Sequence, residues 1–177
     1  MIEVTVDGNI FSFPDDWSVE KYDEWPLYKK LSGSPVLAAQ GCDLVAIHDQ
    51  NLYLIEAKDY TFPTGTRPPP FKELSHTVVR KCFHTLAGLV VEATTPTGSH
   101  EEFCRRAVGC TTILVSLSVE LPTDKGQLFD QAATLVTIAG LLRRDCRVIT
   151  TNKPLVVSNR YGTPLWSSRR HPAPQGT

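Results

Sequence analysis

Two carboxylic acids and a lysine occur around one predicted β-hairpin. Asp43 lies near the start of its first strand, and Glu56 and Lys58 lie at the end of its second. A two-residue or four-residue loop centred between Asp49 and Gln50 places Asp43 directly opposite Glu56, with Cβ atoms about 5 Å apart. Lys58 shares that face because side chains alternate along a strand. A three-residue loop would instead turn Asp43 to the other face.

These residue types favour phosphate chemistry assisted by a metal ion. Two carboxylates about 5 Å apart repel each other unless a cation lies between them. Mg²⁺ binds one or two protein carboxylates and completes its shell with waters and phosphate oxygens. The metal polarises a phosphoryl oxygen and activates water, and a nearby lysine stabilises the developing charge. The alternative is an exposed cross-strand cluster of salt bridges made by the same three residues.

The stretch CDLVAIHDQNLYLIEAKDY, which contains the three residues, resembles the PD-(D/E)xK nuclease superfamily. The pattern of that superfamily is an Asp, a hairpin and Glu-x-Lys, which here are Asp43, Glu56, Ala57 and Lys58. The amino-acid sequence of this stretch is most similar to the resolvase-like, Mrr-like and nuclease-related-domain branches of that superfamily. One departure is that Cys42, and not proline, precedes the aspartate.

The resemblance implies roles for these residues. Asp43, Glu56 and the backbone carbonyl of Ala57 are expected to bind Mg²⁺, for which Mn²⁺ can substitute. Lys58 is expected to act on the attacking water. The catalytic residues implied are therefore Asp43, Glu56 and Lys58.

Some members of the superfamily add an acid from the first helix. A helix is predicted from Trp17 to about Leu31, interrupted by Pro26. Glu20 and Glu24 have i, i+4 spacing in it and are the candidates for a third metal ligand. A solvated helix face explains the same spacing equally well.

The predicted elements describe an α/β protein, a three-layer α/β/α sandwich around a central mixed sheet. This order agrees with the αβββαβ restriction-endonuclease-like core that the resemblance implies. An N-terminal hairpin within residues 1–14 precedes this core, and a basic, partly irregular tail is expected over 153–177. The core elements predicted are a helix at 17–31, strands at 42–47 and 52–58, a helix at 72–93, a strand at 108–119, a helix at 127–144 and a strand at 147–151.

Basic residues in the two long predicted helices form a candidate nucleic-acid-binding surface. In the first of them, basic side chains recur every four residues and could follow a phosphate backbone. An ordinary solvated helix face accounts for the same pattern. The candidates are Lys72, His76, Arg80, Lys81, Arg143 and Arg144.

Composition limits the classes of protein. The chain has 177 residues, 41% of them hydrophobic, and a net charge of −1, which fits one globular domain spanning 1–177. No apolar run approaches the roughly 18 residues needed to span a bilayer. The five cysteines are widely spaced and form no CxxC, which favours a reducing cytoplasm.

These observations predict a cytoplasmic, Mg²⁺-dependent DNA endonuclease of a restriction, repair, recombination or anti-phage system. With little room for a recognition domain, it is expected to form a homodimer or to be a subunit of a larger nuclease assembly. One alternative is a non-catalytic nucleic-acid-binding or scaffold subunit with the same fold. Another is an RNA nuclease that uses the same site. The sequence does not separate DNA from RNA.

Overall fold

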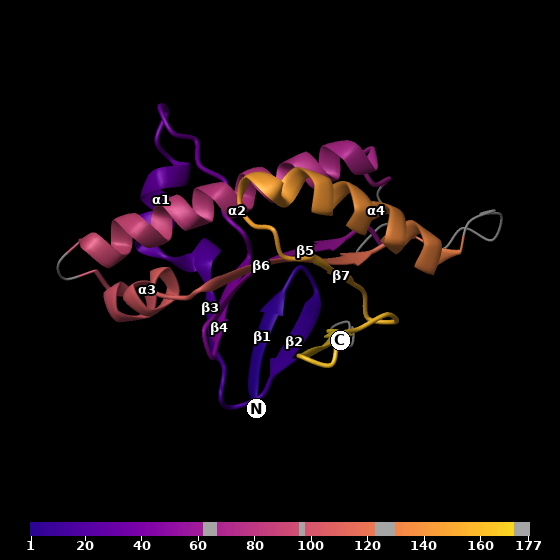
Figure 1. Cartoon of the computed structure of the whole chain (residues 1–177), viewed down its shortest axis with the longest axis horizontal. Coiled ribbons are helices and arrows are strands. Elements are labelled where there is room, and N and C mark those ends of the chain that lie inside the picture. The colour runs from indigo at the N-terminus through magenta and orange to yellow at the C-terminus, as the bar shows by residue number, and fades with distance from the viewer. Residues whose placement is uncertain (62–66, 96–97, 123–129, 172–177) are drawn as a thin grey trace, which may run out of the picture.

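The computed structural model describes residues 1–61, 67–95, 98–122 and 130–171 (Figure 1). The strands are β1 (Ile2–Val6), β2 (Asn9–Phe13), β3 (Ser18–Lys21), β4 (Leu44–His48), β5 (Asn51–Asp59), β6 (Thr112–Glu120), β7 (Leu155–Val157) and β8 (Ser167–Arg170). The helices are α1 (Pro26–Ser32), α2 (Phe71–Thr94), α3 (Glu101–Val108) and α4 (Gln131–Asp145), with short 3₁₀ helices η1 (Tyr22–Glu24) and η2 (Cys146–Val148).

A mixed sheet lies at the centre of the fold. Within the described residues it has five strands in the order β3-β4-β5-β6-β7. β3, β4 and β5 pair antiparallel, whereas β5, β6 and β7 pair parallel. Helices α2 and α4 run above this sheet, and the hairpin of β1 and β2 lies below it (Figure 1). The predicted class, an α/β protein with a mixed sheet flanked by helices, is confirmed.

The two faces of the sheet belong to different hydrophobic clusters. Val45 and Leu54 point to the cluster shared with the helices, whereas Leu44 and Ile55 point to the cluster shared with the small sheet β1-β2-β8. This division follows from the alternation of side chains along each strand. Residues in phase with Leu54, including Glu56, therefore lie on the face that α2 covers.

The register of the β4–β5 hairpin is the predicted one. Leu44 pairs with Ile55 and His48 with Asn51, which leaves a two-residue loop. Asp49 in this loop has a φ of 53°, in the left-handed region that such tight hairpin turns require. The next residues along, Asp43 and Glu56, therefore share one face.

The helix predicted over 17–31 is wrong in its first part. Residues 18–21 form β3, which pairs with β4, residues 22–24 form the short 3₁₀ helix η1, and the α-helix begins only at Pro26. Pro26 takes the first helical position, where its missing N–H costs nothing. Pairing with an open edge of the sheet therefore decides the structure of the segment before it.

Other predicted bounds also differ. Residues 101–108 form α3, so the strand predicted over 108–119 begins only at Thr112. The helix predicted at 127–144 is α4, with residues 127–129 outside the described residues. No strand forms at 147–151, because η2 occupies part of it and β7 provides the partner of β6. The tail expected to be basic and partly irregular contains β7 and β8, and β8 pairs with β2.

Across the described ranges, none of the helices combines the length and the apolar character that a membrane span requires.

Close packing around Tyr22 holds α2 against the start of the sheet. The Tyr22 ring is buried and touches both Gly41 and Gly88, and a Cβ at either glycine would overlap it. The Tyr22 N–H also donates to the Asp43 carbonyl at 3.1 Å. Glycine at position 88 thus lets α2 approach the segment that leads into β4.

We expect Gly88→Ala and Gly140→Ala to change stability in opposite directions. Both glycines lie inside helices, but a Cβ at Gly140 meets nothing within 4 Å. Gly140→Ala should therefore stabilise the fold by about 0.5–1 kcal/mol through backbone entropy. Gly88→Ala should destabilise it by about 1–3 kcal/mol, because Tyr22 must move. Urea denaturation measures both, and equal effects would contradict the packing described.

Candidate functional site

Asp43 closes the end of the β4–β5 pairing with its side chain. It stands one residue before β4, and its Oδ2 accepts a hydrogen bond of 2.7 Å from the Ala57 N–H. The carboxylate thus serves as the acceptor that a longer β4 would have supplied. A second hydrogen bond fixes the preceding residue, because the Cys42 N–H donates to Thr85 Oγ1 of α2 at 2.8 Å.

Glu56 is a fully buried carboxylate. Its Oε1 lies 2.8 Å from Lys58 Nζ and 2.6 Å from Lys81 Nζ, whereas its Oε2 is buried without a hydrogen-bond partner. Burial, and next the charge of Asp43, raise the pKa of Glu56 to about 7, although the two lysines oppose this shift. Glu56 therefore takes up a proton more readily than an exposed glutamate does.

Lys58 lies where the sequence predicts, beside Glu56. Burial by itself would lower the pKa of Lys58, but the charges of Glu56 and Asp43 outweigh burial and raise it. Its ammonium group also lies 3.8 Å from Asp7 Oδ2, in the turn between β1 and β2. Lys58 therefore remains a cation and links the central sheet to the small one.

Lys81 belongs to this cluster, although it was predicted with the nucleic-acid-binding residues. Its Nζ lies 2.6 Å from Glu56 Oε1 and 3.8 Å from Asp43 Oδ1, and its side chain is only 17% exposed. Helical spacing gives the signal that sequence reasoning overlooked. Lys81 lies three residues after Val78 and four before Thr85, both of which are fully buried. We call Asp43, Glu56, Lys58 and Lys81 the charged cluster.

Glu20 and Glu24 do not have the predicted helical spacing. Glu20 lies in β3 and pairs with Val45, and Glu24 ends η1 and forms an ion pair with Lys21 at 2.6 Å. Neither is among the residues that bond Asp43 or Glu56 in the described part of the chain. The charge of Asp43 acts instead on Asp23. Burial is the main cause that raises the pKa of Asp23; the positive charge of Lys21 opposes this shift, and the negative charge of Asp43 adds to it.

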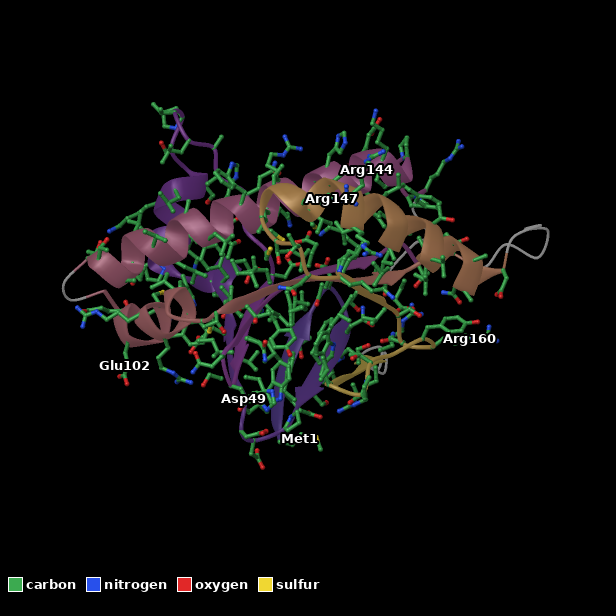
Figure 2. The ribbon with its side chains drawn as sticks, viewed as in Figure 1. Met1, Asp49, Glu102, Arg144, Arg147 and Arg160 are labelled. Atoms are coloured by element: carbon green, nitrogen blue, oxygen red, sulfur yellow. The ribbon has the colours of Figure 1, made fainter. Side chains whose placement is uncertain are left out.

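The remaining basic candidates lie on the outer surface of the helices. Asp145 connects them, because its Oδ2 accepts from Ser75 Oγ at 2.7 Å and lies 3.7 Å from His76 Nε2. The first half of α2 is therefore next to the end of α4. Arg144 lies at that end, and Arg147 follows in η2 (Figure 2). We define the basic patch as the exposed residues Lys72, His76, Arg80, Arg143, Arg144 and Arg147.

The charged cluster can stabilise a cation or neutralise an anion. It contains two carboxylates, those of Asp43 and Glu56, and two ammonium groups that both contact one oxygen of Glu56. Among the residues that the structure describes, no three His, Cys, Asp or Glu side chains group as metal ligands. Any metal held here would therefore need waters, a backbone carbonyl or ligand oxygens in addition to Asp43 and Glu56.

Comparison with known proteins gives one informative match. No family model matches the chain, and no solved structure matches it. The cysteine–tRNA ligase of Neisseria meningitidis serogroup A / serotype 4A (strain DSM 15465 / Z2491) is 28% identical over 200 aligned residues. The alignment covers 97% of this chain but only 28% of the ligase.

This match contradicts the predicted nuclease. The similar protein is named as a ligase that acts on tRNA, and no comparison connects the chain with PD-(D/E)xK enzymes. The predicted superfamily, the Mg²⁺-dependent endonuclease activity and the restriction, repair or anti-phage role are therefore wrong. The physical reason is that a tight hairpin brings any acid and Glu-x-Lys at this spacing to one face, whatever their chemistry.

The unusual pKa of Glu56 predicts a pH dependence of stability in metal-free buffer. Its folded pKa of about 7 exceeds the ordinary 4.5, so the folded chain keeps a proton that the unfolded chain releases between those values. Relative to Glu56→Gln, the wild type should lose up to ~1.4 kcal/mol of unfolding free energy per pH unit across this window. The difference should stay constant above about pH 7.

Urea denaturation of both proteins at half-unit pH steps measures the effect. The Gln side chain has the shape of the glutamate but does not titrate, so other ionisable groups contribute equally to both curves. Curves that stay parallel from pH 4.5 to 7 would contradict the assigned burial of Glu56.

Proposed function

We propose that this chain is an RNA-binding domain that serves tRNA aminoacylation and binds tRNA through its phosphate backbone. The match to the cysteine–tRNA ligase carries the proposal, because it runs through nearly the whole chain. The chain spans only 28% of that ligase, so it corresponds to a domain-sized part of a larger protein. We accordingly assign tRNA binding to the chain, and not the ligation step.

The basic patch supplies a surface for this role. Its side chains are exposed on α2, on the end of α4 and on η2. Arg144 and Arg147 lie on the side of the helices away from the sheet (Figure 2). Asp145 and Glu73 are acids near the patch. Arg144 binds Asp145 at 2.7 Å, and Ser75 donates to it, whereas Glu73 is exposed in the first turn of α2. The patch therefore keeps an excess of positive charge, which suits the spaced phosphates of a folded RNA.

We further propose that the charged cluster binds Mg²⁺ through Asp43 and Glu56, with Mn²⁺ as a substitute. The buried Oε2 of Glu56 has no hydrogen-bond partner, which supports a ligand there. The carbonyl of Ala57 and water molecules would complete the ligand set. Such an ion would offset the negative charge of the two carboxylates.

A cytoplasmic location is part of this proposal, because the substrate of aminoacylation is handled there. All five cysteines are free thiols, which supports a reducing compartment. Association of two copies, and association with a larger assembly, stay predictions. RNA takes the place of DNA as the expected nucleic acid.

Removal of two arginines from the basic patch should weaken tRNA binding. Arg80→Ala with Arg147→Ala removes two positive charges from different elements of the patch. The slope of log Kd against log salt should fall by roughly one unit per lost phosphate contact. Filter binding of a tRNA transcript at several salt concentrations gives both affinity and slope.

Lys29→Ala with Lys30→Ala is the matched control. These exposed lysines of α1 carry the same total charge, but they lie outside the patch. If both double variants lose affinity equally, net charge and not the patch causes binding. Wild-type affinity for tRNA no greater than for duplex DNA of equal length would contradict the proposed function.

Mg²⁺ binding should depend on both acids of the charged cluster. Isothermal titration of the wild-type chain should show a binding event that Asp43→Asn and Glu56→Gln each weaken at least about tenfold, because each removes one carboxylate ligand. Glu102→Gln changes an exposed carboxylate outside the cluster and should leave the event unchanged. Equal binding by all four proteins would exclude this metal site.

A further inference from the structure

Two buried cysteines face each other directly behind the charged cluster. Cys42 precedes Asp43, and Cys82 follows Lys81 in α2. Their sulfur atoms are 3.5 Å apart, and both residues are fully buried. The bond from the Cys42 N–H to Thr85 Oγ1 holds the two segments together beside the sulfurs. The pair thus bridges the boundary between the start of β4 and α2.

We propose that Cys42 and Cys82 form an oxidisable dithiol, a modification site that a hydroperoxide converts to a disulfide. A disulfide needs its sulfurs about 2.0 Å apart, so closure requires an approach of about 1.5 Å from the observed 3.5 Å. The two short side chains must rotate toward each other to make this approach. The 39 residues between them in sequence pose no obstacle, because the fold already brings the two segments into contact.

The chemistry balances with one molecule of peroxide. One thiol loses its proton, and its sulfur attacks a peroxide oxygen; the O–O bond breaks, a sulfenic acid forms and water leaves. The second sulfur then attacks the sulfenic sulfur, so that the S–S bond forms and the S–O bond breaks. The departing hydroxide takes the second thiol proton. With hydrogen peroxide, two thiols are oxidised, the peroxide is reduced and two waters are produced; an organic hydroperoxide yields an alcohol in place of the first water.

The other three cysteines are less well placed to form a disulfide with Cys42 or Cys82. Cys146 is also buried and its charge interacts with Cys82, but its sulfur makes no contact of the kind that joins Cys42 and Cys82 in the described residues. Cys104 lies beside Glu92, and Cys110 is partly exposed and donates to the Arg106 carbonyl at 3.4 Å. Geometry therefore favours one disulfide pairing over the alternatives.

Burial governs the rate of the reaction. The hydrogen bond with Cys42, together with burial, raises the pKa of Cys82, which makes its thiolate scarce at neutral pH. Oxidation should accordingly be slow and should speed up as pH rises. The closed disulfide would fasten the start of β4 to α2, and it would constrain Asp43 and Lys81 through their neighbours. This inference does not rest on RNA binding.

Peptide mapping after exposure to hydrogen peroxide tests the pairing. The full chain is oxidised, alkylated under denaturing conditions, and digested with trypsin and a glutamate-specific protease. Cleavage after Lys30, Glu56, Lys81 and Glu92 isolates Cys42 and Cys82 in separate peptides, each with one cysteine. We expect these peptides joined, a mass lower by two hydrogens, a raised Tm, and reversal of all three by dithiothreitol.

Two variants sharpen the result. Cys42→Ser should abolish the joined peptide, whereas Cys110→Ser, which changes a partly exposed thiol, should leave it in place. The peptide map of the wild-type protein identifies the disulfide pairing by itself, so the proposal can be tested even if a variant misfolds. A map in which Cys82 pairs with Cys146, or in which Cys110 is oxidised while Cys42 and Cys82 stay free thiols, would overturn the proposal.

Discussion

The burial of the Glu56 carboxylate constrains the site and the elements around it. A buried charge is expensive unless it is paired, and Glu56 is paired with two lysines from different directions. Lys58 comes from the same strand, whereas Lys81 comes from α2. The position of α2 above the sheet is therefore set at this point by an ion pair as well as by apolar packing.

The same boundary between α2 and the start of β4 contains further specific contacts. Tyr22 fits against two glycines, Thr85 accepts from the backbone of Cys42, and the sulfurs of Cys42 and Cys82 meet. These contacts require the helix to approach the sheet closely. Charged, polar and sulfur groups thus lie along one closely packed boundary. A substitution at one of them is expected to alter the positions of the others.

The charged cluster and the basic patch have different physical characters. The cluster is largely buried and nearly balanced in charge, which suits a single small ion. The patch is exposed and predominantly positive, which suits an extended polyanion. The match to a tRNA ligase directs attention to RNA, whereas the spacing of the acids alone had suggested nuclease chemistry. A short motif describes geometry, and the class of reaction needs further evidence.

Much of the local structure could be predicted from the sequence. The N-terminal hairpin, the β4–β5 register and the helices near 71–94 and 131–145 follow from turn residues and from periods of two and 3.6 residues. Because that register is local, the placement of Asp43 and Glu56 on one face was predictable as well. These features depend on chain stereochemistry within a few residues.

Tertiary structure decided what depends on distant partners. Residues 18–21 became a strand because the edge of β4 was open to them, and β8 formed because β2 offered an edge. Lys81 turned inward because the face of α2 that carries it packs on the sheet above Glu56. The sequence by itself determined which side chains share a face of a strand or helix. Which faces meet was decided only by the packing of the whole chain, because burial energy depends on surfaces that lie far apart in sequence.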